Sequence, residues 1–228
     1  MAVCGHPRQL AFTLPHQQSL SRDDFLEGPG NAQALGLIER WPDWPSQVMM
    51  LVGPESCGKS HLAAIWAEQA GARTMTAHAL TLANVPGSLA TGALVVENLQ
   101  PGLFDERALF HLLNLAREDR AFVLMSGRAS PSSFAVNLPD LRSRLRALPV
   151  VTLSAPDDAM FRALIVKFCA DRQMSVDEAV VSYLANHIER SFVAVRKAVE
   201  RLDMEALRLR RPVTRALAAE IFREPTAL

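Results

Sequence analysis

The segment between residues 53 and 60 constrains the fold of this chain more than any other feature. It reads Gly-Pro-Glu-Ser-Cys-Gly-Lys-Ser and matches the phosphate-loop pattern G-x-x-x-x-G-K-[ST]. An apolar run at 48–53 directly precedes it, and a helical pattern from Lys59 directly follows it. In that setting the glycines let backbone N–H groups and the helix N-terminus point at phosphate oxygens. The sequence therefore predicts a strand, a phosphate-binding loop and a helix in direct succession.

The residue types in this loop suit a nucleotide with a magnesium ion. Lys59 is placed to reach the β- and γ-phosphates, and the Ser60 hydroxyl to ligate Mg²⁺. We expect ADP or ATP to contact the loop and the residue after it: Gly53, Pro54, Glu55, Ser56, Cys57, Gly58, Lys59, Ser60 and His61. Cys57 admits a redox role, but a small side chain lining the loop is the simpler interpretation.

Apolar runs and helical patterns alternate through the first two thirds of the chain. Strands are expected at 48–53, 73–76, 93–97, 121–125 and 150–153, with helices from Lys59 and from Asp105. Short apolar runs without polar alternation, separated by helices, indicate a parallel sheet that is covered on both faces. The fold class is thus α/β, with a P-loop NTPase core.

After Pro156 the pattern is purely helical. Helices are expected at 157–172, 176–188, 192–210 and 214–223, the second of them opened by a capping box that runs from Ser175 to Glu178. We therefore divide the chain into a polar arm at 1–22, an α/β core at 23–155 and a small helical lid at 156–228.

The strand at 93–97 ends in polar residues that suit the second metal position of a P-loop protein. Glu97 can hold Mg²⁺ through water, although a solvated carboxylate at a strand end is the plainer alternative. Asn98 follows it, and a neutral amide cannot take a proton, which removes an effect of roughly 10²- to 10⁴-fold on the rate. Intrinsic ATP hydrolysis should be weak or absent. Ser126, at the end of the next strand, either contacts the γ-phosphate or attacking water or simply forms a turn.

A short helix with three arginines precedes the last core strand. Leu141, Leu145 and Leu148 share one face of it and should anchor it; the arginines are Arg142, Arg144 and Arg146. At roughly 100° per residue, Arg142 and Arg146 lie together and Arg144 points elsewhere. An arginine used in trans can contribute roughly 10³- to 10⁵-fold to phosphoryl transfer. The alternative is a solvated basic face.

Charge and cysteine usage exclude several classes of protein. Lys plus Arg and Asp plus Glu each number 24, so no global field favours sequence-blind nucleic-acid binding. No segment approaches about 18 uninterrupted apolar residues, so no membrane span is expected. Cys4, Cys57 and Cys169 are far apart, which suggests reduced thiols and a cytoplasmic location.

Taken in order, these residues resemble the nucleotide-binding part of the bacterial replication initiator DnaA. They resemble more closely the DnaA-related AAA+ regulators of the Hda family, in the alphaproteobacterial form HdaA. The resemblance covers nearly the whole chain and rests on residues 25–31, 53–68, 93–97, 142–145 and the Pro156-Asp157 pair.

The resemblance implies specific roles for residues of this chain. Leu26 and Asn31 would lie on the adenine side, Ser126 would be sensor 1, and Arg144 would be an arginine finger acting in trans. In the arm, Gln9, Leu10 and Phe12 look like the short motif that docks on the β sliding clamp of DNA polymerase III. The alternative is a terminal tail without a binding role, because so short a motif has little statistical weight.

The implied function is negative regulation of DNA replication initiation: a nucleotide-bound protein on the DNA-loaded clamp that stimulates ATP hydrolysis by DnaA. A non-catalytic adaptor and a self-sufficient AAA+ ATPase are the alternatives. The chain departs from the family at Glu97-Asn98 and at the sensor 2 position, where Val193 stands and Arg190 or Arg196 could substitute. Because DnaA continues into a DNA-binding domain and this sequence ends at Leu228, sequence-specific DNA binding is not expected. The residues leave homo-oligomer formation open.

Overall fold

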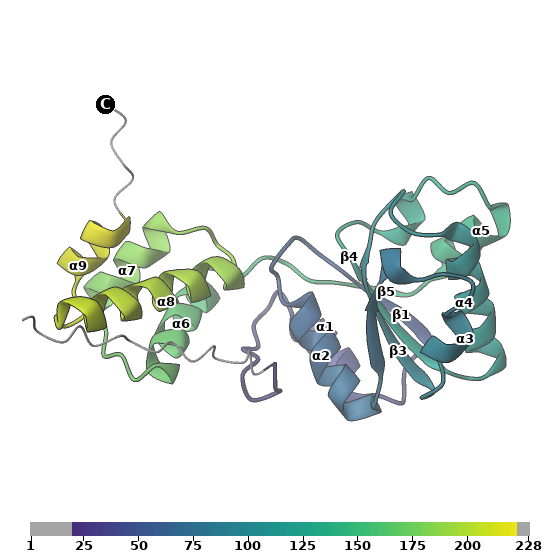
Figure 1. Cartoon of the computed structure of the whole chain (residues 1–228), viewed down its shortest axis with the longest axis horizontal. Helices are drawn as coiled ribbons and strands as arrows, with labels where there is room; N and C mark the ends of the chain where they lie inside the picture. The colour runs from purple at the N-terminus through teal and green to yellow at the C-terminus, as the bar shows by residue number, and fades with distance from the viewer. Residues whose placement is uncertain (1–19, 223–228) are drawn as a thin grey trace, which may run out of the picture.

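The computed structural model describes residues 20–222 of the chain. These residues form an α/β core and a separate helical lid (Figure 1). The proposed clamp-docking residues Gln9, Leu10 and Phe12 lie outside the described residues.

The core is built on a five-stranded parallel sheet with the order β2-β3-β4-β1-β5. The strands are β1 (Val48–Val52), β2 (Arg73–Thr76), β3 (Ala93–Leu99), β4 (Phe122–Gly127) and β5 (Val150–Thr152). Because β4 lies between β1 and β3, the ends of these three strands meet at one edge of the sheet. The phosphate loop, Ser126 and the Glu97-Asn98 pair are thereby brought to the same edge.

Helices cover both faces of the sheet, as the apolar runs predict. Helices α1 (Ala32–Glu39) and α2 (Lys59–Ala70) lie on one face, and α3 (Val85–Ser88), α4 (Glu106–Glu118) and α5 (Pro139–Ala147) on the other (Figure 1). Two short 3-10 turns, η1 (Ala77–Ala79) and η2 (Pro131–Ser133), connect elements on the α4 side.

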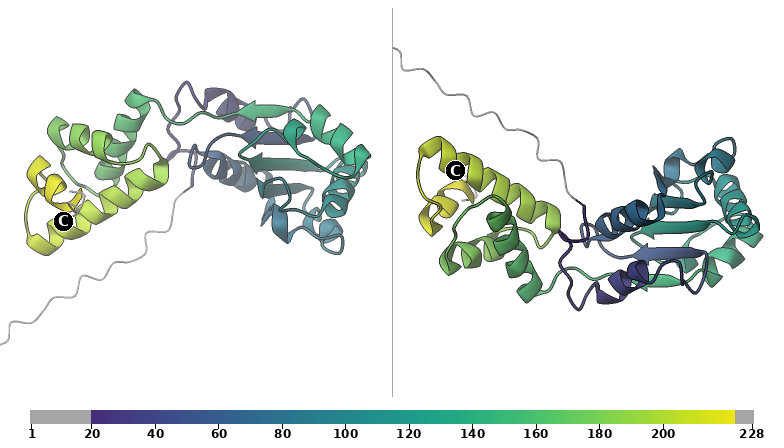
Figure 2. Two further views of the ribbon diagram at one scale, coloured as in Figure 1. Left: turned by 90° about the horizontal axis from the view of Figure 1, so that it is seen from above. Right: turned by 90° about the horizontal axis from the view of Figure 1, so that it is seen from below.

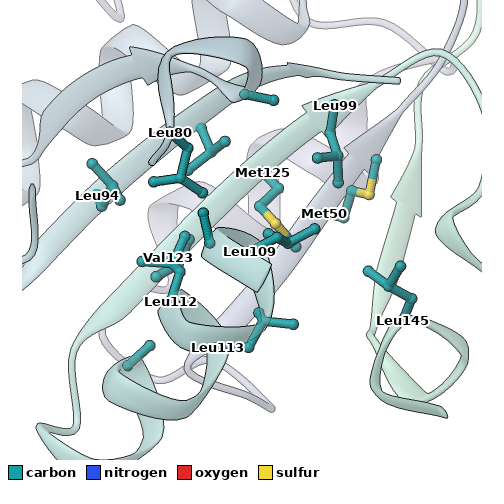
Figure 3. Close-up of a cluster of buried hydrophobic side chains, with 14 of the residues drawn as sticks. Met50, Leu80, Leu94, Leu99, Leu109, Leu112, Leu113, Val123, Met125 and Leu145 are labelled. Atoms are coloured by element: carbon teal, nitrogen blue, oxygen red, sulfur yellow. The ribbon is translucent and has the colours of Figure 1, made fainter. Parts of the chain in front are cut away.

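Alternate side chains of each strand serve the two faces. In β1, Met49 and Leu51 pack with α1 and α2, whereas Met50 and Val52 pack with α4. Figure 3 shows the cluster on the α4 side, where Leu109 of α4 lies beside Met125 and Leu112 lies beside Val123. The inner strands β1, β3 and β4 can be apolar along most of their length because both faces are buried, and this explains their apolar runs in the sequence. The edge strand β2 is more polar and more exposed. The protein has the predicted α/β architecture.

The lid has a hydrophobic core of its own. Its helices are α6 (Asp158–Asp171), α7 (Glu178–His187), α8 (Phe192–Leu209) and α9 (Arg215–Phe222). Phe161, Leu164, Val199 and Leu217 are among the side chains buried between them. Figure 2 shows the lid as a compact group of helices at one end of the molecule, in both views. Within residues 20–222, no helix is both long and apolar enough to cross a bilayer.

The predicted capping box of α7 is wrong. The helix begins at Glu178, and its N-cap is Asp177, whose carboxylate accepts a hydrogen bond from the Val180 N–H at 2.9 Å. Ser175 therefore lies outside the helix. Both residue types cap helices well, and the extended backbone of Asp177 places its side chain over the first turn.

Candidate functional site

The phosphate loop winds tightly between β1 and α2. A Cβ atom on Gly53 would lie 2.5 Å from the Leu153 carbonyl oxygen and 2.8 Å from Cys57 Sγ, so only glycine fits there. Gly58 caps α2 with φ of 102°, in the left-handed region that glycine adopts without strain. The loop therefore has the curled backbone that the sequence pattern predicts, and it leads directly into the N-terminus of α2.

Lys59 lies folded against this loop. Its Nζ donates hydrogen bonds to the carbonyl oxygens of Gly53, at 2.8 Å, and of Pro54, at 2.5 Å. Its positive charge thus sits within the loop. Cys57 is buried and packs in the core beside α1 and α2, in agreement with the interpretation as a small packing residue.

A cavity of about 620 Å³ opens between the loop and the lid. This volume falls within the range of roughly 300–1,000 Å³ that is typical of small-molecule sites. From the loop and α2 it is lined by Glu55, Ser56, Gly58, Lys59, Ser60 and His61; from the strand ends by Asn98, Ser126 and Arg128; from the segment before α1 by Leu20 and Asp24; and from the lid by Lys167, Phe168, Asp171, Arg172, Phe192, Val193, Arg196, Val199 and Glu200. The lining residues thus come from both the core and the lid.

The end of β3 carries a bulge at the polar pair. The pairing of β3 with β4 shifts register between Val96 and Leu99, and Asn98 has φ of 58°. Asn98 lines the cavity. Glu97 Oε1 is buried, and no residue described in the structure donates a hydrogen bond to it. Such an atom is costly to bury unless something else satisfies it.

The side chains of Ser60 and Glu97 have the chemistry of ligands for a magnesium ion that is held jointly with phosphate. The Ser60 hydroxyl and the Glu97 carboxylate are oxygen donors, and Mg²⁺ is usually bound by one or two such protein ligands together with substrate phosphates and water. Glu97 Oε1 has no hydrogen-bond partner among the described residues, but Glu97, unlike Ser60, is not among the residues that line the cavity. Among residues 20–222, no group of three or more His, Cys, Asp or Glu side chains is placed to hold a metal ion alone.

Arg128 and Glu55 form an ion pair at the mouth of the cavity. Arg128 Nη2 lies 2.7 Å from Glu55 Oε2, and both side chains are more than half exposed. Ser126, two residues before Arg128 on β4, is only 3% exposed. Sequence reasoning missed Arg128, although its place just after a candidate sensor strand was a usable signal.

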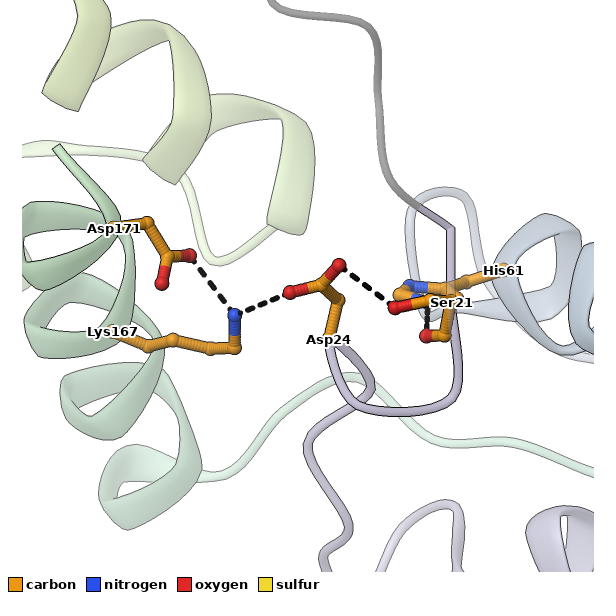
Figure 4. A network of polar contacts seen from close by, with 5 residues as sticks. All are labelled: Ser21, Asp24, His61, Lys167 and Asp171. Carbon is orange, nitrogen blue, oxygen red and sulfur yellow. Dashed lines mark hydrogen bonds and ion pairs between the residues drawn. The ribbon is translucent and has the colours of Figure 1, made fainter.

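Residues 20–31, which we call the leading segment, contact both the lid and α2, the helix that follows the phosphate loop. The Ser21 carbonyl accepts a hydrogen bond from His61 Nε2 at 2.8 Å, and the Ser21 hydroxyl donates to Asp24 at 2.9 Å (Figure 4). Asp24 in turn pairs with Lys167 on α6 at 3.0 Å, and Lys167 pairs with Asp171 at 2.9 Å. This network runs from α2 to α6 along one wall of the cavity.

Burial affects the pKa of two members of this network. Desolvation lowers the pKa of His61 below its ordinary value and outweighs the hydrogen bond to the Ser21 carbonyl. Desolvation also acts to lower the pKa of Lys167, but the carboxylates of Asp171 and Asp24 outweigh it and raise that pKa. Lys167 therefore stays charged and keeps the leading segment bound to the lid.

Comparison with known proteins identifies the fold. The structure superposes on domain III of the replication initiation protein DnaA from Thermotoga maritima with a TM-score of 0.71, at 18% identity, over 90% of this chain and 98% of that one. It superposes on the RuvB Holliday junction branch migration motor of Thermotoga maritima with a TM-score of 0.71, at 16% identity, over 88% of this chain and 70% of that one. This chain has the AAA+ P-loop NTPase fold.

Other comparisons add less. AMPPCP-bound DnaA from Aquifex aeolicus gives a TM-score of 0.65 at 17% identity, over 80% of this chain and 64% of that one. In sequence, an uncharacterised protein of Haemophilus influenzae is 26% identical over 110 residues, which span about half (48%) of each protein. No known family profile matches the chain.

The residues predicted on the adenine side, Leu26 and Asn31, belong to the leading segment, and neither is among the described residues that line the cavity. Asn31 is buried, its Nδ2 donates to the Leu26 carbonyl at 2.9 Å, and its Oδ1 accepts from the Gly28 N–H at 2.9 Å. Both ends of the amide are thus used to hold the turn. Leu26 packs against the lid core.

The lid presents one of the two proposed sensor 2 substitutes to the cavity. Arg196 lines the cavity and lies over the Phe168 ring, 5.9 Å from its centroid. Arg190 instead pairs with Asp158 at 2.6 Å and is not among the lining residues. Val193 also lines the cavity and is 46% exposed. Of the two arginines, Arg196 is therefore the one placed to meet a ligand there.

The three arginines of α5 make different contacts, and they lie on the α4 side of the core. Arg142 donates to the Val136 carbonyl at 2.6 Å, and Arg146 is exposed. Arg144 lies over the Phe110 ring of α4, 5.1 Å from its centroid. Arg144 is not among the described residues that line the cavity of its own chain.

Proposed function

We propose that this chain binds ADP or ATP with Mg²⁺ and regulates the replication initiator DnaA, as its resemblance to the Hda regulators implies. The observation that carries the proposal is the cavity of about 620 Å³ between phosphate loop and lid. A second support is the fold, since 90% of this chain superposes on domain III of DnaA. The loop N–H groups and Lys59 would bind the phosphates, and the leading segment near Leu26 and Asn31 would lie on the adenine side.

The proposed metal ligands are Ser60 and, through water, Glu97. A magnesium ion there would neutralise charge on the phosphate oxygens. Asn98 would stand where a proton-accepting carboxylate would orient the attacking water, so the chain itself would hydrolyse ATP slowly or not at all. Ser126, buried at the end of β4 and lining the cavity, would contact the terminal phosphate or that water.

Because the chain itself would hydrolyse ATP slowly or not at all, we propose that it promotes the hydrolysis of ATP bound by a partner protein. Arg144 lies on α5, outside the cavity of its own chain, and its guanidinium is held by the ring of Phe110. Stacking of this kind limits the motion of a long side chain while leaving its N–H donors available. We propose that Arg144 enters the ATP site of DnaA and stabilises charge developing on the transferred phosphoryl group.

The arm is proposed to bring the chain to its place of action. Gln9, Leu10 and Phe12 would dock on the β sliding clamp after the clamp has been loaded on DNA. This docking would raise the effective concentration of Arg144 near DnaA without requiring this chain to recognise a DNA sequence.

A DnaA-ATP hydrolysis assay with clamp loaded on DNA tests this function. Arg144→Ala should fold, bind ADP and bind the clamp, yet lose the acceleration of hydrolysis. Arg144→Lys should restore little of it, because an ammonium lacks the planar, multi-donor fork. Arg146→Ala is the matched control, since Arg146 is exposed on the same helix and should be dispensable.

Two further variants separate the parts of the proposal. Lys59→Ala should lose nucleotide binding, and simultaneous replacement of Gln9, Leu10 and Phe12 by Ala should lose clamp binding with unchanged thermal stability. Full stimulation by Arg144→Ala would refute the finger and leave an adaptor. Rapid ATP turnover by the chain alone would instead favour a self-sufficient ATPase.

A further inference from the structure

We propose that Arg128 and Glu55 form a switchable ion pair that makes the cavity discriminate between nucleoside triphosphate and diphosphate. Arg128 would leave Glu55 and bind the terminal phosphate when a triphosphate enters. With a diphosphate, the pair would stay closed. This inference rests on the proposed nucleotide binding and assigns to that same site a residue that selects its ligand.

Arg128 reaches the phosphate loop from the neighbouring strand. Val52 at the end of β1 is in register with Gly127, and the Gly53 N–H donates to the Gly127 carbonyl at 3.2 Å. The chain therefore leaves β4 beside the start of the phosphate loop, and the Arg128 side chain meets Glu55 at 2.7 Å. Both side chains line the cavity.

The pair lies toward the terminal-phosphate end of the proposed site. Lys59 is the residue that reaches the β- and γ-phosphates in a loop of this type. Asn98 and Ser126 come from the strand ends that hold metal, water and γ-phosphate in phosphoryl-transfer sites, and they line the same cavity. Arg128 follows Ser126 by two residues on the same strand end, so its guanidinium approaches from that side.

Arg128 differs from Lys167 and Arg172, two other cations that line the cavity, in where its carboxylate partner lies. Lys167 pairs with Asp24 and Asp171, and Arg172 with Glu200 and Asp203. These partners belong to the lid or to the leading segment. Arg128, in contrast, pairs with a carboxylate of the phosphate loop itself. A phosphate group that enters the loop therefore competes directly with Glu55 for this guanidinium.

The competition favours a γ-phosphate over the carboxylate. The Arg128 and Glu55 side chains are 56% and 71% exposed, and exposed pairs of this kind contribute little stability, so the pair is easily broken. A terminal phosphate carries more charge and offers three acceptor oxygens in a geometry that suits the guanidinium fork. The β-phosphate of a diphosphate is already bound by loop N–H groups and Lys59, so it gains less from Arg128.

The test is to measure the affinities of the purified chain for ADP and for the non-hydrolysable triphosphate AMPPCP, each with Mg²⁺, by calorimetry. Arg128→Ala should weaken AMPPCP binding by roughly tenfold or more, the scale of one charge-assisted hydrogen bond, and ADP binding by less than about threefold. Glu55→Gln should shift the ratio the other way, because it removes a competitor and a repulsive charge at the same place.

Arg162→Ala is the matched control, because Arg162 forms an ion pair of the same length, 2.7 Å, with Glu178 on the lid surface. It should leave both affinities unchanged. Equal effects of Arg128→Ala on the two ligands, or an unchanged ratio in Glu55→Gln, would overturn the inference while nucleotide binding stands. If the parent binds neither ligand, or if Lys59→Ala binds both as the parent does, the proposed function fails and the inference fails with it.

Discussion

His61 joins the phosphate loop to the leading segment through a single side chain. It follows Ser60 in the first turn of α2, its ring is met edge-on by Phe25 at 5.1 Å, and its Nε2 lies 2.8 Å from the Ser21 carbonyl oxygen. Burial lowers its pKa, since the charged imidazolium would lose much of its hydration here. The neutral ring is thus the form that the folded protein prefers.

This lowered pKa predicts that acid destabilises the protein through His61. When the pH falls through about 6.5, the ordinary pKa of histidine, the unfolded chain binds a proton before the folded chain does. Stability then rises with pH in this window, because the unfolded state carries more protons. The contribution of His61 is fully present above about pH 6.5 and is lost as the pH falls toward the lowered folded-state value.

Urea midpoints between pH 8 and pH 5 measure this effect. The parent should lose stability more steeply below neutral pH than His61→Gln, whose amide can still donate to the Ser21 carbonyl. His78→Gln is the control, since His78 is exposed and should keep the slope of the parent. Parallel pH profiles of the parent and His61→Gln would contradict the assignment.

The sequence predicts some site residues and misses others for a physical reason. Lys59 and Ser60 are marked by a contiguous pattern, because one loop performs their chemistry. Arg128 and Lys167 acquire their roles only from partners that are distant along the chain, Glu55 and Asp24. The place of Arg128 after a strand end marks it as a candidate, but no local pattern encodes either pairing.

At the scale of elements, periodicity predicts the strands and most of the long helices closely. The strand expected at 121–125 is Phe122–Gly127, and the helix expected at 192–210 is Phe192–Leu209. The sequence pattern does not predict helix α1, because this helix is only 8 residues long, has no acidic residue in its first turn and lacks a side-chain cap. Burial against α2 and the sheet stabilises α1, and the intrinsic helix propensity of its residues contributes less.

The N-cap of α7 is another feature that the sequence pattern misplaces, and its position predicts the effect of two substitutions on stability. Asp177→Ala should destabilise the protein by about 1 kcal/mol, the usual cost of losing a cap that accepts a backbone N–H. Ser175→Ala should change stability by less than about 0.5 kcal/mol, because Ser175 lies outside the helix. Chemical denaturation of both variants makes this comparison, and the reverse order of effects would restore Ser175 as the cap.

At the scale of the whole molecule, the cavity lies between two separately packed parts. The core packs around its sheet and the lid around its own apolar cluster, as the clusters built on Met50 and on Leu164 show. The leading segment and the link from β5 to α6 connect them, with the Asp24–Lys167 pair between (Figures 1 and 4). A ligand in the cavity would therefore touch both parts at once.

This arrangement predicts that nucleotide couples the stability of the lid to that of the core. ADP at a hundredfold excess over its Kd should stabilise the protein by about 2.7 kcal/mol, because it binds only the folded state. If the ligand bridges both parts, hydrogen exchange of buried amides in the lid, such as Leu164 and Val199, should slow together with that of Leu51 in β1.

The Lys59→Ala variant is the control and should show no change on addition of ADP. Protection confined to β1 and α2 would mean that the core alone holds the nucleotide and that the lid residues lining the cavity contribute nothing. Protection of Val199 in the parent, lost in Lys59→Ala, requires instead that a ligand anchored at the loop reaches α8. That result would make the nucleotide the element that joins core and lid into one cooperative unit.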